Sequence, residues 1–207
     1  MKIVHINSTD IQGGAARAAY RLHKALRMSK VDSMMFVLWS YSQEQGVINY
    51  DPSLQKGIWE RRGILRRIIE HDFKKYQRIM PEMYEMFSDD RSIYTQSVVK
   101  QLPSCDIINL HWISGFIDYS SFFPQAKPIV WTLHDMNPFT GGCHYNNECL
   151  RYLAGCGSCP QLGSIEETDL SREIWKRKKA VFDRIDASRL TFVTPSTWLS
   201  KEVSQSP

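Results

Sequence analysis

Short apolar runs alternate with longer amphipathic stretches along this chain. The runs are brief and end in turns, which is typical of strands buried in a parallel sheet. The longer stretches repeat apolar residues every three or four positions, as helices do. The predicted strands are residues 2–6, 33–39, 106–112, 128–135 and 190–195. The predicted helices are 14–29, 58–80, 91–101, 169–185 and one that begins at Thr197 behind a Ser196 cap.

Strands that alternate with helices predict an α/β fold: a Rossmann-like, doubly wound parallel sheet with helices on both faces. Residues 40–57 are polar, contain Asp51-Pro52 and are predicted to form a loop. A chain of 207 residues is long enough for one good core. We therefore expect a single domain over residues 1–207, with a Gly- and Cys-rich insertion at 140–163.

In such a sheet, ligands bind beyond the carboxyl ends of the strands. Gly13-Gly14 lies there, where the first predicted strand passes into the first helix. Glycines let a ligand approach the backbone, and the free N–H groups of a helix start favour an anion such as phosphate. The alternative is that the glycines serve only a tight turn. No G-x-G-x-x-G pattern is present, so the dinucleotide-binding fingerprint fails. His111 and His134 end two further strands at the same edge.

Composition is that of an ordinary soluble protein, with 43% apolar and 23% charged residues. No run of 18 apolar residues and no signal peptide is seen, so a cytoplasmic location with reduced cysteines is expected. The net charge of +4 lies wholly in residues 58–80, which hold seven Lys/Arg and three Asp/Glu. No nucleic-acid motif accompanies that charge, and no nucleic-acid partner is expected.

The basic helix predicted at residues 58–80 has two interpretations. Its apolar stripe predicts packing on the domain with a solvated basic side; the stripe is Ile58, Leu65, Ile69, Phe73, Tyr76 and Met80. Alternatively, the helix docks on an anionic membrane, with Trp59 at the interface. The basic residues available for that contact are Arg61, Arg62, Arg66, Arg67, Lys74, Lys75 and Arg78.

Four of the five cysteines fall within seventeen residues: Cys143, Cys149, Cys156 and Cys159. The C-x2-C of "GCGSC" is typical of a knuckle that turns two thiolates towards one metal. In a cytosolic chain this spacing favours structural zinc, with His144 as a spare ligand. Two disulfides, Cys143–Cys149 with Cys156–Cys159 or crossed, and free thiols remain as alternatives.

The segments "GGAARAAYRLHKAL", "NLHWISGF", "TLHDMNPFTGGCHYNNECLRYLAGCGSCPQL" and "FVTPSTWLSKEV" resemble the amino-terminal half of family 4 (group 1) glycosyltransferases, in a bacterial branch associated with surface polysaccharides. The resemblance implies a retaining, nucleotide-sugar-dependent enzyme of the GT-B fold. In that family the first Rossmann-like half mainly binds acceptor. The second half, with most donor contacts, is expected to be absent from this chain, so the isolated fragment should be inactive.

The resemblance also implies residue roles. Gly13, Gly14 and Ala15 would lie near the donor diphosphate, and His134 near the transferred sugar as the catalytic side chain. His111 would line the acceptor side or be purely structural, and Asp135 would orient its loop. The implied partners are a nucleotide sugar, a glycan or lipid-linked acceptor and the inner membrane face, without a catalytic metal. A zinc-stabilised binding module without chemistry is the alternative function.

Overall fold

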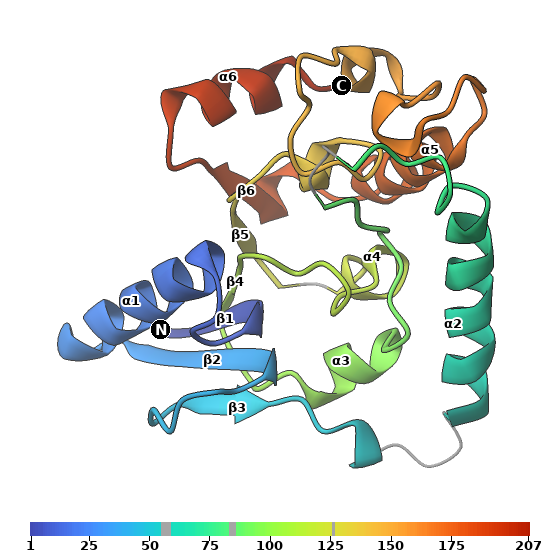
Figure 1. The fold of residues 1–207 in the computed structure, drawn as a ribbon. Coiled ribbons are helices and arrows are strands. Elements are labelled where there is room, and N and C mark those ends of the chain that lie inside the picture. Colours follow the sequence, from blue (N-terminus) through green and yellow to red (C-terminus); the bar gives the residue numbers. More distant parts are fainter. Residues whose placement is uncertain (55–58, 83–85, 126) are drawn as a thin grey trace.

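The computed structural model describes residues 1–54, 59–82, 86–125 and 127–207, with the side chain of Trp59 excepted. A parallel sheet of six strands in the order β3-β2-β1-β4-β5-β6 lies between helices (Figure 1). The strands are β1 (Lys2–Thr9), β2 (Asp32–Trp39), β3 (Val47–Asn49), β4 (Ile107–Leu110), β5 (Ile129–Thr132) and β6 (Leu190–Val193). This is the Rossmann strand order, and the predicted fold class is confirmed.

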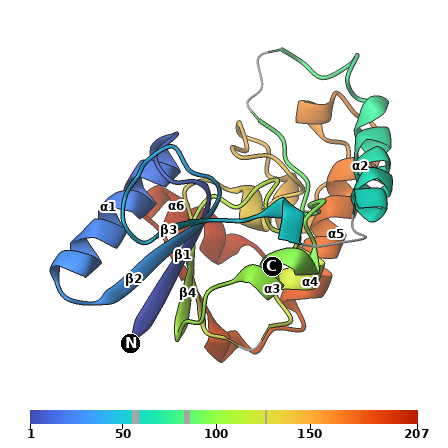
Figure 2. The same cartoon turned by 90° about the horizontal axis from the view of Figure 1, so that it is seen from below.

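Helix α1 covers one face of the sheet, and α3, α4 and α5 cover the other (Figures 1 and 2). The helices are α1 (Gly14–Met28), α2 (Trp59–Lys74), α3 (Gln96–Gln101), α4 (Tyr119–Phe122), α5 (Leu170–Phe182) and α6 (Thr197–Gln205). The predicted cap of α6 is present: the Ser196 hydroxyl accepts the Leu199 N–H at 3.2 Å. None of the described helices is long and apolar enough to cross a membrane.

The core lies between the sheet and the helices α3, α4 and α5, and it also fixes the carboxyl ends of the strands. Trp131 of β5 is almost fully buried and stacks on Phe123, with ring centroids 5.5 Å apart. Its indole Nε1 donates to the carbonyl of His111 at 3.0 Å. A buried indole N–H usually finds such a partner. The same side chain therefore fills the core and holds the backbone at the end of β4.

Several predicted boundaries differ from the structure. The predicted loop 40–57 contains strand β3, whose three residues pair with Met35–Val37 of β2. Three residues are too few for a periodic signal, so only the neighbouring strand defines them. Helix α3 begins at Gln96 rather than at 91, because the preceding residues make other contacts. Arg91, for example, pairs with Asp72 at 2.8 Å and with Asp89 at 2.6 Å.

Helix α2 stands at the edge of the molecule, beside α5 and the Cys-rich segment (Figure 1). It ends at Lys74, six residues before the predicted end at Met80. Its apolar stripe faces inward as predicted: Tyr76, just beyond the helix, is buried, and Phe73 is half-buried against the same small cluster. The Tyr76 hydroxyl accepts the Leu170 N–H at 3.0 Å, which ties this segment to the start of α5. Ile58 lies outside the described residues.

Arg62 is a correction to the predicted basic surface. Its side chain is buried, with 5% exposure, and its guanidinium lies over the Tyr50 and Tyr94 rings at 5.8 and 5.3 Å. It donates to the carbonyl of Pro52 at 3.2 Å and to the Tyr50 hydroxyl. Aromatic rings from two distant segments thus enclose a residue that helical periodicity places on the basic side. Arg62 is therefore not available to an anionic surface.

Candidate functional site

The strand order reverses direction between β1 and β4, and a doubly wound sheet binds ligands at that switch point. The loop after β1 is held there by side chains. Asn7 accepts the Trp112 N–H at 2.7 Å and donates to the carbonyl of Thr9 at 2.6 Å. Asp10 is fully buried and accepts the N–H groups of Tyr41 and Ser42 at 2.9 and 2.8 Å. These bonds fix the backbone that leads into α1.

Gly13 and Gly14 form the start of α1 at this edge. Gly13 adopts φ +88°, a conformation that favours glycine. A Cβ added at Gly14 would meet nothing within 4 Å, so there is room for a side chain at this position. Within the described residues, no side chain caps this helix start, and its first turn contains no acidic residue. The N–H groups of this first turn have no partner within the helix, and the positive end of the helix dipole lies there.

The two predicted histidines lie together at the same edge. Nδ1 of His111 is 3.1 Å from Nε2 of His134, and the two rings are stacked with centroids 5.4 Å apart. His111 is buried, whereas His134 is half-buried. Burial lowers the pKa of both, that of His111 to about 2. Both rings are therefore neutral at physiological pH.

Two further polar residues, which are not among the predicted site residues, lie beside these histidines. His5 of β1 and Asn109 of β4 are opposite each other in the sheet register, and both are buried. Nδ1 of His5 is 2.9 Å from Oδ1 of Asn109 and 3.2 Å from Nε2 of His111. A signal was present: polar residues recur at every second position in "HIN" (5–7) and "NLH" (109–111), which places them on one face of each strand.

Asp135 holds the loop that follows β5. Its carboxylate accepts the Asn137 N–H at 2.9 Å and faces Nδ1 of His144 at 2.7 Å. Nε2 of that histidine lies 2.8 Å from the Ser88 hydroxyl. Both carboxylate oxygens of Asp135 are therefore engaged in contacts within its own loop.

Lys178 of α5 holds the same loop and was not singled out from the sequence. It is buried, and its Nζ donates to the carbonyls of Asn137 at 2.5 Å and of Thr140 at 3.2 Å. Burial lowers its pKa to about 8. In the sequence it is one of several basic residues of an amphipathic helix, so nothing marks it as the one that turns inward.

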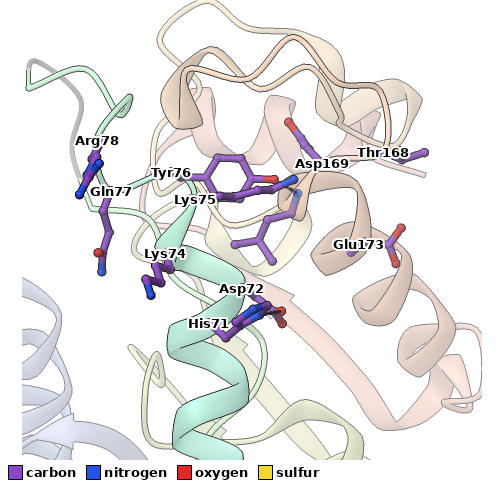
Figure 3. Close-up of a pocket in the computed structure, with 11 residues that line it drawn as sticks. His71, Asp72, Lys74, Lys75, Tyr76, Gln77, Arg78, Thr168, Asp169 and Glu173 are labelled. Atoms are coloured by element: carbon purple, nitrogen blue, oxygen red, sulfur yellow. Dashed lines mark hydrogen bonds and ion pairs between the residues drawn. The ribbon is translucent and has the colours of Figure 1, made fainter.

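A further cavity lies away from the strand ends, between the end of α2 and the start of α5 (Figure 3). Its volume is about 820 Å³, against about 10 Å³ for the cavity at His111 and His134. Several groups of the larger cavity already serve the fold: Lys75 pairs with Glu166 at 3.0 Å, and Asp169 caps α5 by accepting the Arg172 N–H at 3.1 Å. We therefore assign the candidate site to the sheet edge, where the unoccupied donors lie.

The four clustered cysteines line one common cavity of about 20 Å³. All of them are free thiols, and Sγ of Cys156 accepts the Gly141 N–H at 3.1 Å. Burial raises the pKa of Cys156 and of Cys159 to about 12, and the nearby Cys143 acts in the same direction. The lining cysteines are Cys143, Cys149, Cys156 and Cys159.

The donor set suits zinc, but its arrangement in this structure does not yet form a site. Across the described part of the chain, no group of three or more His, Cys, Asp or Glu side chains is placed so that it could hold a metal ion. Four thiols around a cavity that holds about one water molecule have the right chemistry for zinc. The zinc site stays a prediction, to be decided by the metal content of protein purified under reducing conditions.

The chain is therefore a Rossmann-like α/β domain with an uncapped glycine helix start at the switch point of its sheet. The chain is 22% identical over 204 residues to WcaC of Escherichia coli (strain K12), a proposed colanic acid biosynthesis glycosyl transferase. The match covers 95% of this chain and 49% of WcaC, so the chain spans about half the length of that relative. No family model matches the chain, and no solved structure matches it at a significant level.

Proposed function

We propose that this chain is the amino-terminal, acceptor-side domain of a retaining glycosyltransferase that uses a nucleotide sugar in polysaccharide biosynthesis. The observation that carries the proposal is the uncapped glycine start of α1 at the switch point, in the same sheet edge as His134. A nucleotide sugar presents a diphosphate, and free N–H groups at a helix start bind phosphate oxygens. The similarity to WcaC runs through nearly the whole chain and supports the same class of reaction.

In this proposal Gly13, Gly14 and Ala15 form the wall against the donor diphosphate. His134 donates a hydrogen bond to an oxygen of the transferred sugar, where it stabilises charge as the glycosidic bond breaks. Asp135 and Lys178 keep the following loop in place by the contacts described above. The protein's contribution is electrostatic and positional: it holds the leaving diphosphate and the acceptor on the same face of the sugar.

The proposal is tested by assaying the complete protein, and this chain alone, with a panel of nucleotide sugars and lipid-linked or glycan acceptors. The complete protein should release nucleoside diphosphate only when donor and acceptor are both present. The chain alone should give no product, since in the resembled family most donor contacts belong to the other half. A complete protein that binds sugars without turnover would favour the alternative, a zinc-stabilised binding module.

We further propose that the outward face of α2 attaches the protein to an anionic membrane surface, where a lipid-linked acceptor would reside. Two isoleucines one turn apart are exposed on that face, Ile64 by 52% and Ile68 by 47%. The exposed basic residues of α2 and of the segment just after it are Arg61, Arg66, Arg67, Lys74, Lys75 and Arg78. An apolar pair within a basic surface suits the boundary between lipid headgroups and acyl chains. The side chain of Trp59 lies outside the described residues.

The expected result is co-sedimentation with vesicles that contain anionic lipid, at low salt, and little binding to neutral vesicles. The triple variant Arg61→Gln, Arg66→Gln, Arg67→Gln should weaken the partition more than about a hundredfold, at about 1 kcal/mol per basic residue. A matched variant that removes three exposed charges elsewhere, Arg21→Gln, Lys30→Gln and Lys100→Gln, should bind like the wild type. Equal losses in both variants would contradict a specific role of α2.

A further inference from the structure

Four polar side chains form a continuous hydrogen-bonded row on the α1 side of the sheet, from its interior to its carboxyl edge. The row begins at Asn109, passes through His5 and His111, and ends at His134 with separations of 2.9, 3.2 and 3.1 Å. The first three side chains are buried, and the last is half-buried. Within the described part of the chain, Nδ1 of His134 has no hydrogen-bond partner. The row thus connects the interior to one imidazole nitrogen at the edge.

The direction of the hydrogen bonds is set at Asn109. Its Nδ2 donates to the carbonyl of Val130 at 2.9 Å and lies 3.2 Å from the Thr132 hydroxyl. A backbone carbonyl only accepts, so the amide NH2 must face Val130 and the amide oxygen must face His5. That oxygen in turn needs a donor, so Nδ1 of His5 carries the proton. Its Nε2 is buried without a partner in the described structure, which favours a bare lone pair over an unsatisfied N–H there.

The remaining protons follow in order along the row. Nδ1–H of His5 also faces Nε2 of His111, so that nitrogen must present its lone pair. A neutral imidazole carries one proton, so His111 is protonated at Nδ1 and donates to Nε2 of His134. His134 then carries its own proton on Nδ1, the nitrogen without a partner. Burial lowers the pKa of His5 to about 4, in keeping with a neutral row.

We propose that Asn109 and His5 are positioning residues, which act through His111 to fix His134 in the Nδ1–H tautomer so that it meets its ligand as a hydrogen-bond donor. The ligand chemistry that this selects is an acceptor oxygen, such as a sugar hydroxyl or a phosphate oxygen. His134 in this state cannot take a proton from the acceptor through Nδ1. The role in sugar recognition rests on the proposed function, whereas the tautomer itself does not.

The test is a long-range ¹H–¹⁵N correlation spectrum of the histidine side chains, recorded on ¹⁵N-labelled chain at pH 7.5. The two ring nitrogens of a neutral histidine differ strongly in ¹⁵N shift, so the spectrum assigns the tautomer of each ring directly. We expect His5, His111 and His134 to be neutral Nδ1–H tautomers, with the exposed His71 as the reference for a ring outside the row. His134 found as the Nε2–H tautomer, or as the cation, would overturn the proposal without any variant.

The variant Asn109→Leu removes the acceptor that orients the row. The ratio of Nδ1–H to Nε2–H tautomer at His134 should fall about tenfold, which corresponds to the loss of one hydrogen bond. Thr132→Val is the matched control, since it removes only the secondary contact of Asn109 and leaves the bond to Val130. An unchanged tautomer ratio in a folded Asn109→Leu chain would refute the role of Asn109. Because this measurement needs no sugar donor, a failed transfer assay would count against the proposed function alone.

Discussion

Replacement of Gly14 by valine is expected to lower the rate of sugar transfer by the complete protein at least about a hundredfold while the fold remains intact. The side chain has room in the free structure, because a Cβ at Gly14 meets nothing within 4 Å and the residue is helical. Valine also has a higher helix propensity than glycine. In the complex, however, its methyl groups would occupy the space in which a phosphate oxygen reaches the N–H groups of α1. Losing such preorganised donors typically costs a factor of about 10²–10³ in rate.

The matched control is Gly63→Val in α2, another helical glycine whose Cβ would meet nothing within 4 Å. Both variants should retain the circular dichroism spectrum and the free energy of unfolding of the wild type within about 1 kcal/mol. Only Gly14→Val should lose transfer, and donor binding measured by calorimetry should weaken with it. Full activity of folded Gly14→Val would remove the glycine turn from the proposed site.

Lowering the pH from 7.5 to 5 is expected to reduce the free energy of unfolding by about 3 kcal/mol. The unfolded chain protonates His5 and His111 below pH 6.5, whereas burial in the folded chain holds their pKa values at about 4 and about 2. Their contribution is therefore complete above pH 6.5 and is lost as the pH falls, by about 2 kcal/mol for each histidine at pH 5. His134, whose pKa is also lowered by burial, acts in the same direction.

One acidic group opposes this loss. Burial raises the pKa of Asp90 to about 6, although its ion pair with Arg177 at 2.7 Å acts against that shift. As the pH falls, the folded chain therefore binds a proton at Asp90 before the unfolded chain does. This raises the free energy of unfolding by about 1 kcal/mol at pH 5. Because the contribution of Asp90 is the same in every histidine variant, a comparison of variants measures the contribution of the histidines alone.

Urea unfolding of the chain at pH 7.5 and pH 5 measures the effect. The variant His111→Gln should retain the transition at both pH values but show a pH dependence smaller by about 2 kcal/mol, because one titrating ring is gone. His71→Gln replaces a histidine with 85% side-chain exposure outside the row and is the matched control for the substitution itself. A wild-type chain equally stable at both pH values would contradict a row of buried neutral imidazoles.

The class of fold was predictable because it depends on local properties. A βαβ unit is visible in the apolar runs at residues 2–6 and 33–39 and in the helical repeat between them. Each of these signals is a spacing of apolar residues over a short stretch of chain. The glycine turn at Gly13 and the cap at Ser196 were likewise visible, since each is a property of a few consecutive residues. The spacing of the cysteines also indicated that they gather, and all four line one cavity.

The side chains that complete the site were less accessible to such reasoning. His5 and Asn109 are 104 positions apart, and only the register of β1 against β4 brings their polar atoms to 2.9 Å. Strand β3 exists because β2 offers it an edge. In each case a contact with another segment of the chain, rather than the local sequence pattern, determines the structure.

By itself, then, the sequence determined the α/β fold class, the glycine turn before α1 and the presence of histidines where two strands end. Only the tertiary structure decided which polar residues are buried and to which partners they are bonded. It placed Arg62 between two tyrosines, turned Lys178 onto the loop carbonyls, and joined His134 to the interior through a row of neutral rings. The physical reason is that period and turn chemistry act over a few residues, whereas burial and hydrogen bonding of a polar side chain depend on groups that folding brings from far along the chain.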